Sequence, residues 1–122
     1  LDFRAEILNE AGNPTSADDG FSYKKLLCIA FDLAVIRAHL DVKFPRFVYH
    51  DGIFEALDDR KKENLLAVVR RYADLGLQPI ITLIDSDLPQ RATTEPVFEE
   101  GEVALVLHDE GDDGRLFKMS AW

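Results

Sequence analysis

Residues 44–84 read FPRFVYHDGIFEALDDRKKENLLAVVRRYADLGLQPIITLI, and this stretch decides the fold. Residues 44–50 and 78–84 are short runs rich in strand-forming side chains, and an aspartate follows each run. Between them, residues 60–75 place apolar side chains on one face and basic side chains on the other, which predicts a helix. Strand, helix and strand in this order form a βαβ unit, so we expect two parallel neighbouring strands.

The residues at both ends of the predicted helix are suited to capping. Asp58 or Asp59 is expected to cap the N-terminus, because a carboxylate accepts hydrogen bonds from the free backbone N–H groups there. Gly76 is expected to end the helix, because glycine readily adopts the left-handed conformation that follows a helix.

A second helix is predicted upstream, over residues 22–40. Ser22 is either its N-cap or lies just inside it. Asp32 is the one charged residue between Leu26 and Ile36, and a helix that is apolar on almost every side is typical of the centre of a domain. We therefore expect this helix to be buried and Asp32 to pair with a nearby basic residue.

The two ends of the chain carry weaker patterns. Residues 2–9 alternate as a strand does, and residues 10–20 form a loop rich in turn-forming residues. Near the C-terminus, residues 103–108 and 115–119 flank an acidic turn, which predicts an antiparallel hairpin. The fold class is therefore α/β, a small mostly parallel sheet with two main helices and a C-terminal antiparallel hairpin.

Length and composition limit the class of protein. A chain of 122 residues with 47% hydrophobic and 30% charged residues is expected to form a single globular domain over residues 1–122. One cysteine excludes an internal disulfide, and no apolar run reaches the roughly 20 residues of a membrane span, so we expect no membrane partner. The chain begins at Leu1 and shows no signal peptide, so it is interpreted as a cytoplasmic fragment.

The formal net charge of −9 is concentrated near the C-terminus. Residues 95–113 contain eight acidic residues and no Lys or Arg, whereas the rest of the chain holds 15 acidic residues (23 − 8) against 14 basic ones. Phosphate contacts need Lys and Arg, so the charge argues against nucleic-acid binding only by this acidic segment.

Aspartates at strand ends are the candidates for chemistry. Ligands of α/β sheets bind beyond the carboxyl ends of the strands, where Asp51 follows the first strand and Asp85 and Asp87 follow the second. A carboxylate there commonly holds Mg²⁺ together with a phosphate. The same residue type also caps turns and helices, so the spacing alone leaves both interpretations open.

Two stretches together resemble the C-terminal part of an ATPase head. Residues 47–58, FVYHDGIFEALD, resemble the Walker B strand and D-loop of the SMC/RecN-type ABC ATPases, with Asp51 and the pair Leu57–Asp58 at the family's spacing. Residues 16–25, SADDGFSYKK, resemble the signature loop and helix of the same family. In order and spacing, the motifs SADxG, YKKLL, FDLA, HDG and SDLP are also similar to an uncharacterised C-terminal domain of bacterial SMC-like coiled-coil proteins.

The resemblance, which covers residues 16–89, implies a role for each matching residue. It implies that Asp51 positions Mg²⁺ at ATP and that Asp58 contacts the opposing head. Gly20, Ser22 and Lys24 would belong to the signature loop, which touches the γ-phosphate of ATP bound to the other subunit. The implied partners are an N-terminal P-loop lobe of the same protein, a second head in a homodimer, and DNA through the full complex. The implied function is nucleotide-gated head engagement in DNA repair, maintenance or defence.

The sequence departs from the family pattern at three places. No G-x-x-x-x-G-K-[ST] motif is present, so the 122 residues alone are expected to be inactive. Gly52 stands where the family has its catalytic glutamate, and Glu55 is the nearest acid. No histidine occurs near Ile84, where the family has its switch histidine. These departures predict slow hydrolysis, or association gated by nucleotide with little turnover.

Two other functions remain open at this stage. A stand-alone Mg²⁺-dependent phosphotransfer or nuclease domain would use Asp51, Asp85 and Asp87 as a carboxylate cluster. A non-catalytic interaction module would instead use the acidic C-terminal segment to dock a basic partner.

Overall fold

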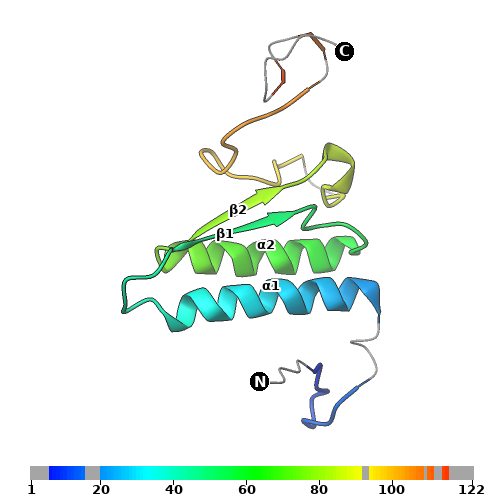
Figure 1. Cartoon of the computed structure of the whole chain (residues 1–122). Helices are drawn as coiled ribbons and strands as arrows, with labels where there is room; N and C mark the ends of the chain where they lie inside the picture. The colour runs from blue at the N-terminus through cyan, green and yellow to red at the C-terminus, as the bar shows by residue number, and fades with distance from the viewer. Residues whose placement is uncertain (1–5, 16–19, 92–93, 109, 112–113, 116–122) are drawn as a thin grey trace, which may run out of the picture. The chain divides into compact units, whose positions relative to one another are not determined.

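Figure 1 shows the computed structural model of the whole chain. It describes residues 6–15, 20–91, 94–108, 110–111 and 114–115. The chain divides into two compact units, Leu1–Gln90 and Arg91–Trp122, and each is described by itself. The single-domain interpretation of residues 1–122 stays a prediction. None of the helices in the described part of the chain is long and apolar enough to cross a membrane.

The first unit contains the predicted βαβ arrangement. Strands β1 (Phe47–Asp51) and β2 (Gln78–Thr82) pair in parallel, and helix α2 (Asp59–Asp74) connects them. The α/β fold class and the parallel pairing are therefore confirmed. Strand β1 begins three residues later than predicted, after Pro45, which has no backbone N–H to give to a ladder.

Both predicted caps of α2 are present. The side chain of Asp58, not that of Asp59, accepts a hydrogen bond from the backbone N–H of Lys61 at 2.9 Å. At the other end, Gly76 has a φ of 81° and donates its N–H to the carbonyl of Ala73 at 2.8 Å. The local sequence therefore fixed this helix at both ends, as capping chemistry predicts.

Helix α1 (Phe21–Ala38) forms where predicted, but the expectation that it is buried on all sides is wrong. Only Ile29, Leu33 and Ile36 are buried, whereas Phe31 is 43% exposed and Cys28 is exposed. The reason is that, within the described residues, the unit covers one stripe of α1 and leaves the opposite apolar stripe open. The carboxylate of the half-buried Asp32 lies 3.9 Å from Nε2 of His50 in β1, and the two form an ion pair only when His50 is protonated.

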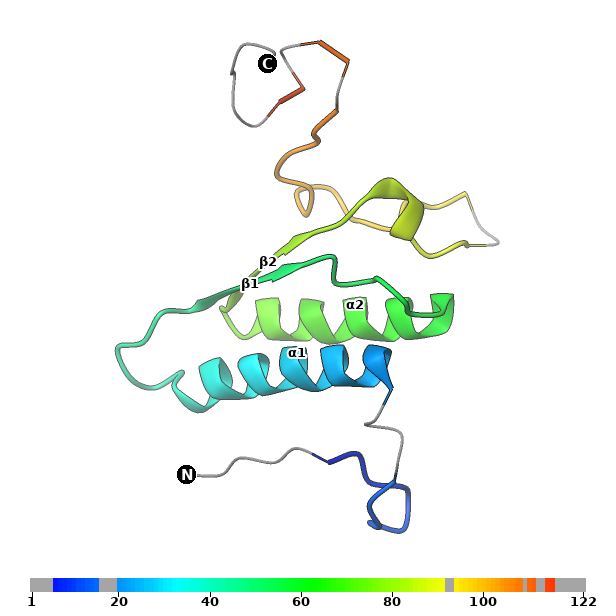
Figure 2. The ribbon, with the colours of Figure 1, turned by 45° about the vertical axis from the view of Figure 1, so that its right-hand side comes forward.

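Among the described residues of the first unit, helices cover only one face of the sheet. Figures 1 and 2 show both helices on the same side of β1 and β2. Exposure alternates accordingly, with Val48, His50 and Ile81 half-buried towards the helices. The other face exposes the alternate side chains of both strands, namely Phe47, Tyr49, Asp51, Gln78, Ile80 and Thr82. Parallel sheets are normally covered on both faces.

The core of the unit lies between the helices and the covered face of the sheet. It takes side chains from α1, from α2, from the residue before β2 and from the turn after β1: Ile29, Leu33, Ile36, Ile53, Phe54, Leu57, Leu65, Leu66 and Leu77. Ile53 and Phe54, which are 0% and 1% exposed, are the two most deeply buried large side chains. The turn after β1 is therefore anchored in the core and holds its polar residues in place.

The predictions for the two ends of the chain were less successful. Of the strand predicted at residues 2–9, only residues 6–9 are described, and they form one isolated bridge between Leu8 and Pro14. In the second unit, residues 103–108 form no strand, although the N–H of His108 donates to the carbonyl of Gly114 at 3.0 Å. Residues 116–119 of the predicted second arm lie outside the described residues. Residues 103–108 are exposed, so burial gives them no reason to adopt a strand.

Candidate functional site

The carboxyl ends of the two strands hold Asp51 beside Thr82. These residues stand opposite each other in the parallel register, and the hydroxyl of Thr82 donates a hydrogen bond to Oδ1 of Asp51. The hydroxyl of Tyr49 lies 3.2 Å from Oγ1 of Thr82. All three side chains lie on the open face of the sheet, so the carboxylate of Asp51 is exposed and held in a defined direction.

The N-terminal turn of α1 lies against the loop that follows β1. Oγ of Ser22 donates to the carbonyl of Ala56 at 2.8 Å. Nζ of Lys25 donates to the carbonyl of Gly52 and forms an ion pair with Oε2 of Glu55 at 2.9 Å. Residues from two segments that are about thirty positions apart in the sequence therefore meet at one place.

The loop itself has a tightly defined backbone. Gly52 has a φ of 56°, which favours glycine, and its N–H donates to the carbonyl of Thr82 at 2.9 Å. The N–H of Glu55 donates a hydrogen bond to the carbonyl of Gly52 at 3.0 Å. Ala56 also has a positive φ, of 57°. We call the side chains and backbone groups gathered here the strand-end cluster, which consists of Ser22, Lys25, Asp51, Gly52, Glu55 and Thr82.

The predicted signature-loop residues contribute unequally to this cluster. Gly20 is the N-cap of α1, with an extended backbone and its carbonyl accepting from the N–H of Lys24 at 3.0 Å. Ser22 contacts the loop, but the side chain of Lys24 is exposed, and Lys25 makes the contacts instead. Residues 16–19 of the predicted loop lie outside the described part of the chain. The sequence did not distinguish Lys25 from Lys24, because neighbouring residues of a helix point in different directions and the sequence does not show which direction faces the loop.

Asp58 lies at the start of α2 and is engaged within its own helix. Its Oδ1 accepts from the N–H of Lys61, and its Oδ2 forms an ion pair with Nζ of Lys61 at 2.6 Å. Hydrogen bonds from the side chain and then the backbone of Lys61 hold the pKa of Asp58 below its usual value. Nζ of Lys61 also lies 5.5 Å from the ring centre of Tyr23 in α1. Both carboxylate oxygens of Asp58 therefore serve the helix cap.

The carboxylates after β2 lie in a turn of their own. Asp85 and Asp87 begin and end the single 3-10 turn η2 (Asp85–Asp87), where the N–H of Asp87 donates to the carbonyl of Ile84 at 2.9 Å. Within the described residues, no three His, Cys, Asp or Glu side chains form a group that could hold a metal ion. The structure therefore does not bring Asp51, Asp85 and Asp87 together as one ligand set.

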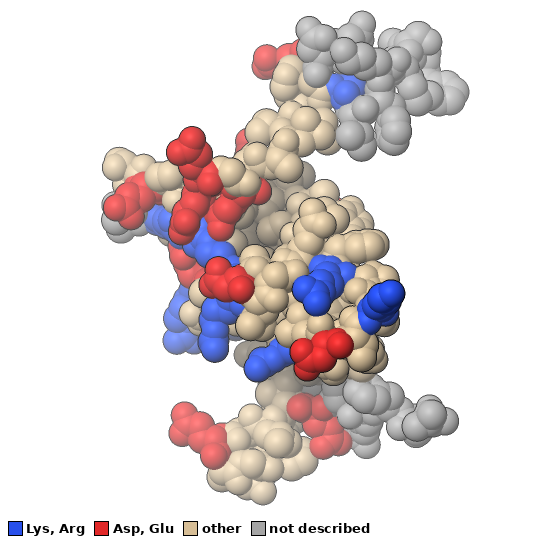
Figure 3. Space-filling model, turned by 90° about the vertical axis from the view of Figure 1, so that its left-hand side faces the viewer, with Lys and Arg blue, Asp and Glu red and all other residues tan. Residues whose placement is uncertain are grey.

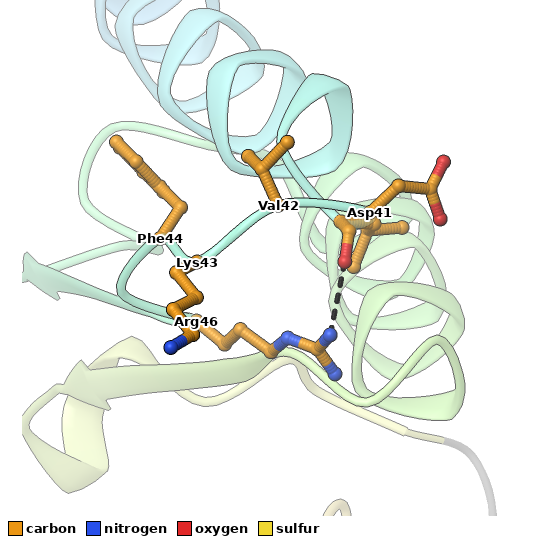
Figure 4. Close-up of a pocket in the computed structure, with 6 residues that line it drawn as sticks. Asp41, Val42, Lys43, Phe44 and Arg46 are labelled. Atoms are coloured by element: carbon orange, nitrogen blue, oxygen red, sulfur yellow. Dashed lines mark hydrogen bonds between the residues drawn. The ribbon is translucent and has the colours of Figure 1, made fainter.

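A pocket lies at the opposite end of the strands, in the connection between α1 and β1 (Figure 4). It is lined by Leu40, Asp41, Val42, Lys43, Phe44 and Arg46. The guanidinium of Arg46 donates to the carbonyl of Leu40 at 2.9 Å, and the ring of Phe44 stacks on His39 with centres 4.6 Å apart. Figure 3, which views this side of the molecule, shows Lys and Arg interspersed with Asp and Glu. No motif in the sequence pointed to this pocket.

The chemistry available at the strand-end cluster follows from its parts. Mg²⁺ is commonly held by one or two carboxylates together with substrate phosphates and water, so an exposed, oriented Asp51 fits such a role. The N-terminus of α1 carries a partial positive charge that favours a phosphate. No phosphate-cradling motif accompanies them in the sequence.

Comparison with known proteins gives one match. Residues 1–121 match the family described as "Uncharacterised protein conserved in bacteria (DUF2326)". No curated protein and no solved structure is significantly similar to the chain.

Proposed function

The chain belongs to the DUF2326 family of bacterial proteins, and we propose that it forms the C-terminal lobe of an SMC-like ABC ATPase head. In this proposal the lobe supplies the Walker B aspartate, the D-loop and the signature helix. An N-terminal P-loop lobe of the same protein supplies the remaining phosphate contacts. ATP with Mg²⁺ then gates the engagement of two heads, in a cytoplasmic machine for DNA repair, maintenance or defence.

The observation that carries the proposal is the position of Asp51. Its carboxylate stands at the carboxyl end of a parallel strand and is oriented by the hydroxyl of Thr82. Ser22 and Lys25 tie the N-terminus of α1 to the loop that follows this same strand. A candidate metal ligand and a candidate phosphate-binding helix end are thus attached to one loop.

The two uncovered surfaces support the part of the proposal that requires a further lobe. A sheet of two parallel strands with one bare face is marginal by itself, and α1 exposes an apolar stripe that includes Cys28 and Phe31. In the proposed head, these two surfaces are covered by packing against the N-terminal lobe.

The residue roles within the proposal are those that the resemblance to ABC ATPase heads implies. Asp51 binds Mg²⁺ directly or through water, and Gly20, Ser22 and Lys24 face the γ-phosphate of ATP held by the opposing head. Asp58 lies at the head-to-head contact, where its bonds to Lys61 fix the start of α2. DNA is bound by the assembled complex.

Binding of ATP with Mg²⁺ by the full-length protein tests the proposal. Asp51→Ala should abolish Mg²⁺-dependent ATP binding, measured by isothermal titration calorimetry. Asp41→Ala is the matched control, because Asp41 is another exposed aspartate and lies at the far end of the strands. Unchanged ATP binding in Asp51→Ala would contradict the role of Asp51 and the proposed function.

A further inference from the structure

The carboxyl group of Glu55 fills the space beside Gly52 that any other residue at this position would need for its side chain. A Cβ atom added to Gly52 would stand 2.8 Å from both the carboxyl carbon and Oε1 of Glu55. Real Cβ atoms essentially never approach another atom so closely. The carboxylate of Glu55 therefore lies directly against the backbone of Gly52, the residue that follows Asp51, and a side chain at position 52 would displace it.

Contacts rather than burial hold Glu55 in this position. Its side chain is 58% exposed, yet Nζ of Lys25 pairs with Oε2 at 2.9 Å. Nζ of Lys25 also donates to the carbonyl of Gly52, so one ammonium group fixes both the loop backbone and the carboxylate. The neighbouring side chains of Ile53 and Phe54 are fully buried in the core and anchor the turn.

From this geometry we propose that Glu55 is the carboxylate that orients the attacking water in the ATPase, and that Lys25 is its positioning residue. The inference rests on the proposed function and deepens it. The other carboxylates of the loop are committed elsewhere, because Asp51 is the proposed metal ligand and both oxygens of Asp58 bind Lys61. Lys25 pairs with Oε2, so Oε1 of Glu55 is the oxygen outside the ion pair.

The chemistry that this role requires is the hydrolysis of ATP. The water oxygen forms a bond to the γ-phosphorus, and the bond from that phosphorus to the β,γ-bridging oxygen breaks. The bonding electron pair leaves with ADP, and a proton of the water passes to Glu55 and then to solvent. ATP and water thus give ADP, phosphate and a proton. Phosphoryl transfer depends on such positioning of the nucleophile, and one acid–base group contributes about 10²–10⁴-fold in rate.

The first test compares binding with turnover in the full-length protein. Glu55→Gln should lower kcat at least about 100-fold and leave the affinity for ATP and Mg²⁺ within about twofold of wild type. Wild-type turnover in Glu55→Gln, or the absence of any turnover in the wild-type protein, would overturn the role of Glu55. A failure of the proposed function itself would instead appear as unchanged ATP binding in Asp51→Ala.

The second test uses the space beside Gly52. Gly52→Ala should push the carboxylate of Glu55 away and lower kcat at least about tenfold with ATP binding retained. Gly12→Ala is the matched control, since Gly12 also has a positive φ, of 80°, but an added Cβ there meets nothing within 4 Å. A similar loss of turnover in both variants would show that backbone strain, and not the position of Glu55, is responsible.

Variants of Lys25 separate positioning from a purely structural role. Lys25→Met should lower kcat without raising KM for ATP, and Lys25→Arg should keep the ion pair and most of the rate. If Lys25 only ties α1 to the loop, Lys25→Met lowers the unfolding midpoint and leaves kcat of the folded protein unchanged, which contradicts the proposal.

Discussion

Truncation of Phe54 tests whether the turn after β1 is held in place by its buried side chains. Phe54 is 1% exposed, and replacing a buried phenylalanine by alanine costs about 3–5 kcal/mol, because apolar contact is lost and a cavity is left. Domains are stable by only about 5–15 kcal/mol in total, so Phe54→Ala should be severely destabilised. Phe47→Ala is the matched control, because Phe47 is 56% exposed on the open face of the sheet and should cost about 1 kcal/mol.

Urea unfolding followed by circular dichroism measures this difference. With a slope of about 1.5 kcal/mol per molar urea, a loss of about 3 kcal/mol lowers the midpoint by about 2 M, and the Phe47 control shifts by less than about 1 M. Phe54→Leu keeps most of the apolar volume, so its loss of stability should lie between those of the other two variants, at about 1–2 kcal/mol. This variant keeps the test informative if Phe54→Ala does not fold. Equal midpoint shifts for Phe54→Ala and Phe47→Ala would refute the claim that the core anchors this turn.

Two further predictions concern the cap of α2 and the open face of the sheet. Lys61 holds the pKa of Asp58 below 3.8, so the charged form contributes stability above that pH, and the contribution is lost as pH falls through the lower folded value. The gap in thermal midpoint between wild type and Asp58→Asn should therefore be present at neutral pH and shrink below pH 3.8; a constant gap would contradict this linkage. On the open face, Ile80→Ser should weaken association of the chain with the proposed N-terminal lobe, measured by co-purification, because Ile80 is 42% exposed beside β1. Leu75→Ser, at a similarly exposed site after α2, should leave association unchanged, and equal effects of both variants would argue against the sheet face as the contact.

The βαβ unit could be predicted from the sequence because its signals are local. Asp58 and Gly76 cap α2 through contacts within one helical turn, and apolar strand runs bracket that helix. The burial of α1 could not be predicted in the same way. Its composition favours a helix covered on all sides, but covering surfaces come from other parts of a fold, and the described residues supply only one.

The candidate site was predicted only in part, for a related reason. The position of Asp51 at the carboxyl end of its strand was predicted because it follows directly from the strand pattern, and its role in chemistry stays a prediction. The choice of Lys25 over Lys24, and the approach of Glu55 to Gly52, depend on how α1 packs against a loop far away in the sequence. A sequence motif contains no information about that packing. Conversely, Asp85 and Asp87 share the strand-end pattern of Asp51 but fall in a 3-10 turn outside the cluster.

Reconstitution of the two lobes measures the central proposal most directly. The 122-residue chain, the N-terminal P-loop lobe of the full-length protein, and an equimolar mixture of both are each titrated with ATP in the presence of Mg²⁺. If the chain is half of a head, the mixture binds ATP with Mg²⁺ more tightly than either lobe alone, and the 122-residue chain alone shows almost no binding. Equal binding of ATP by the 122-residue chain alone and by the mixture would contradict the proposal, and so would a mixture that binds no better than the P-loop lobe.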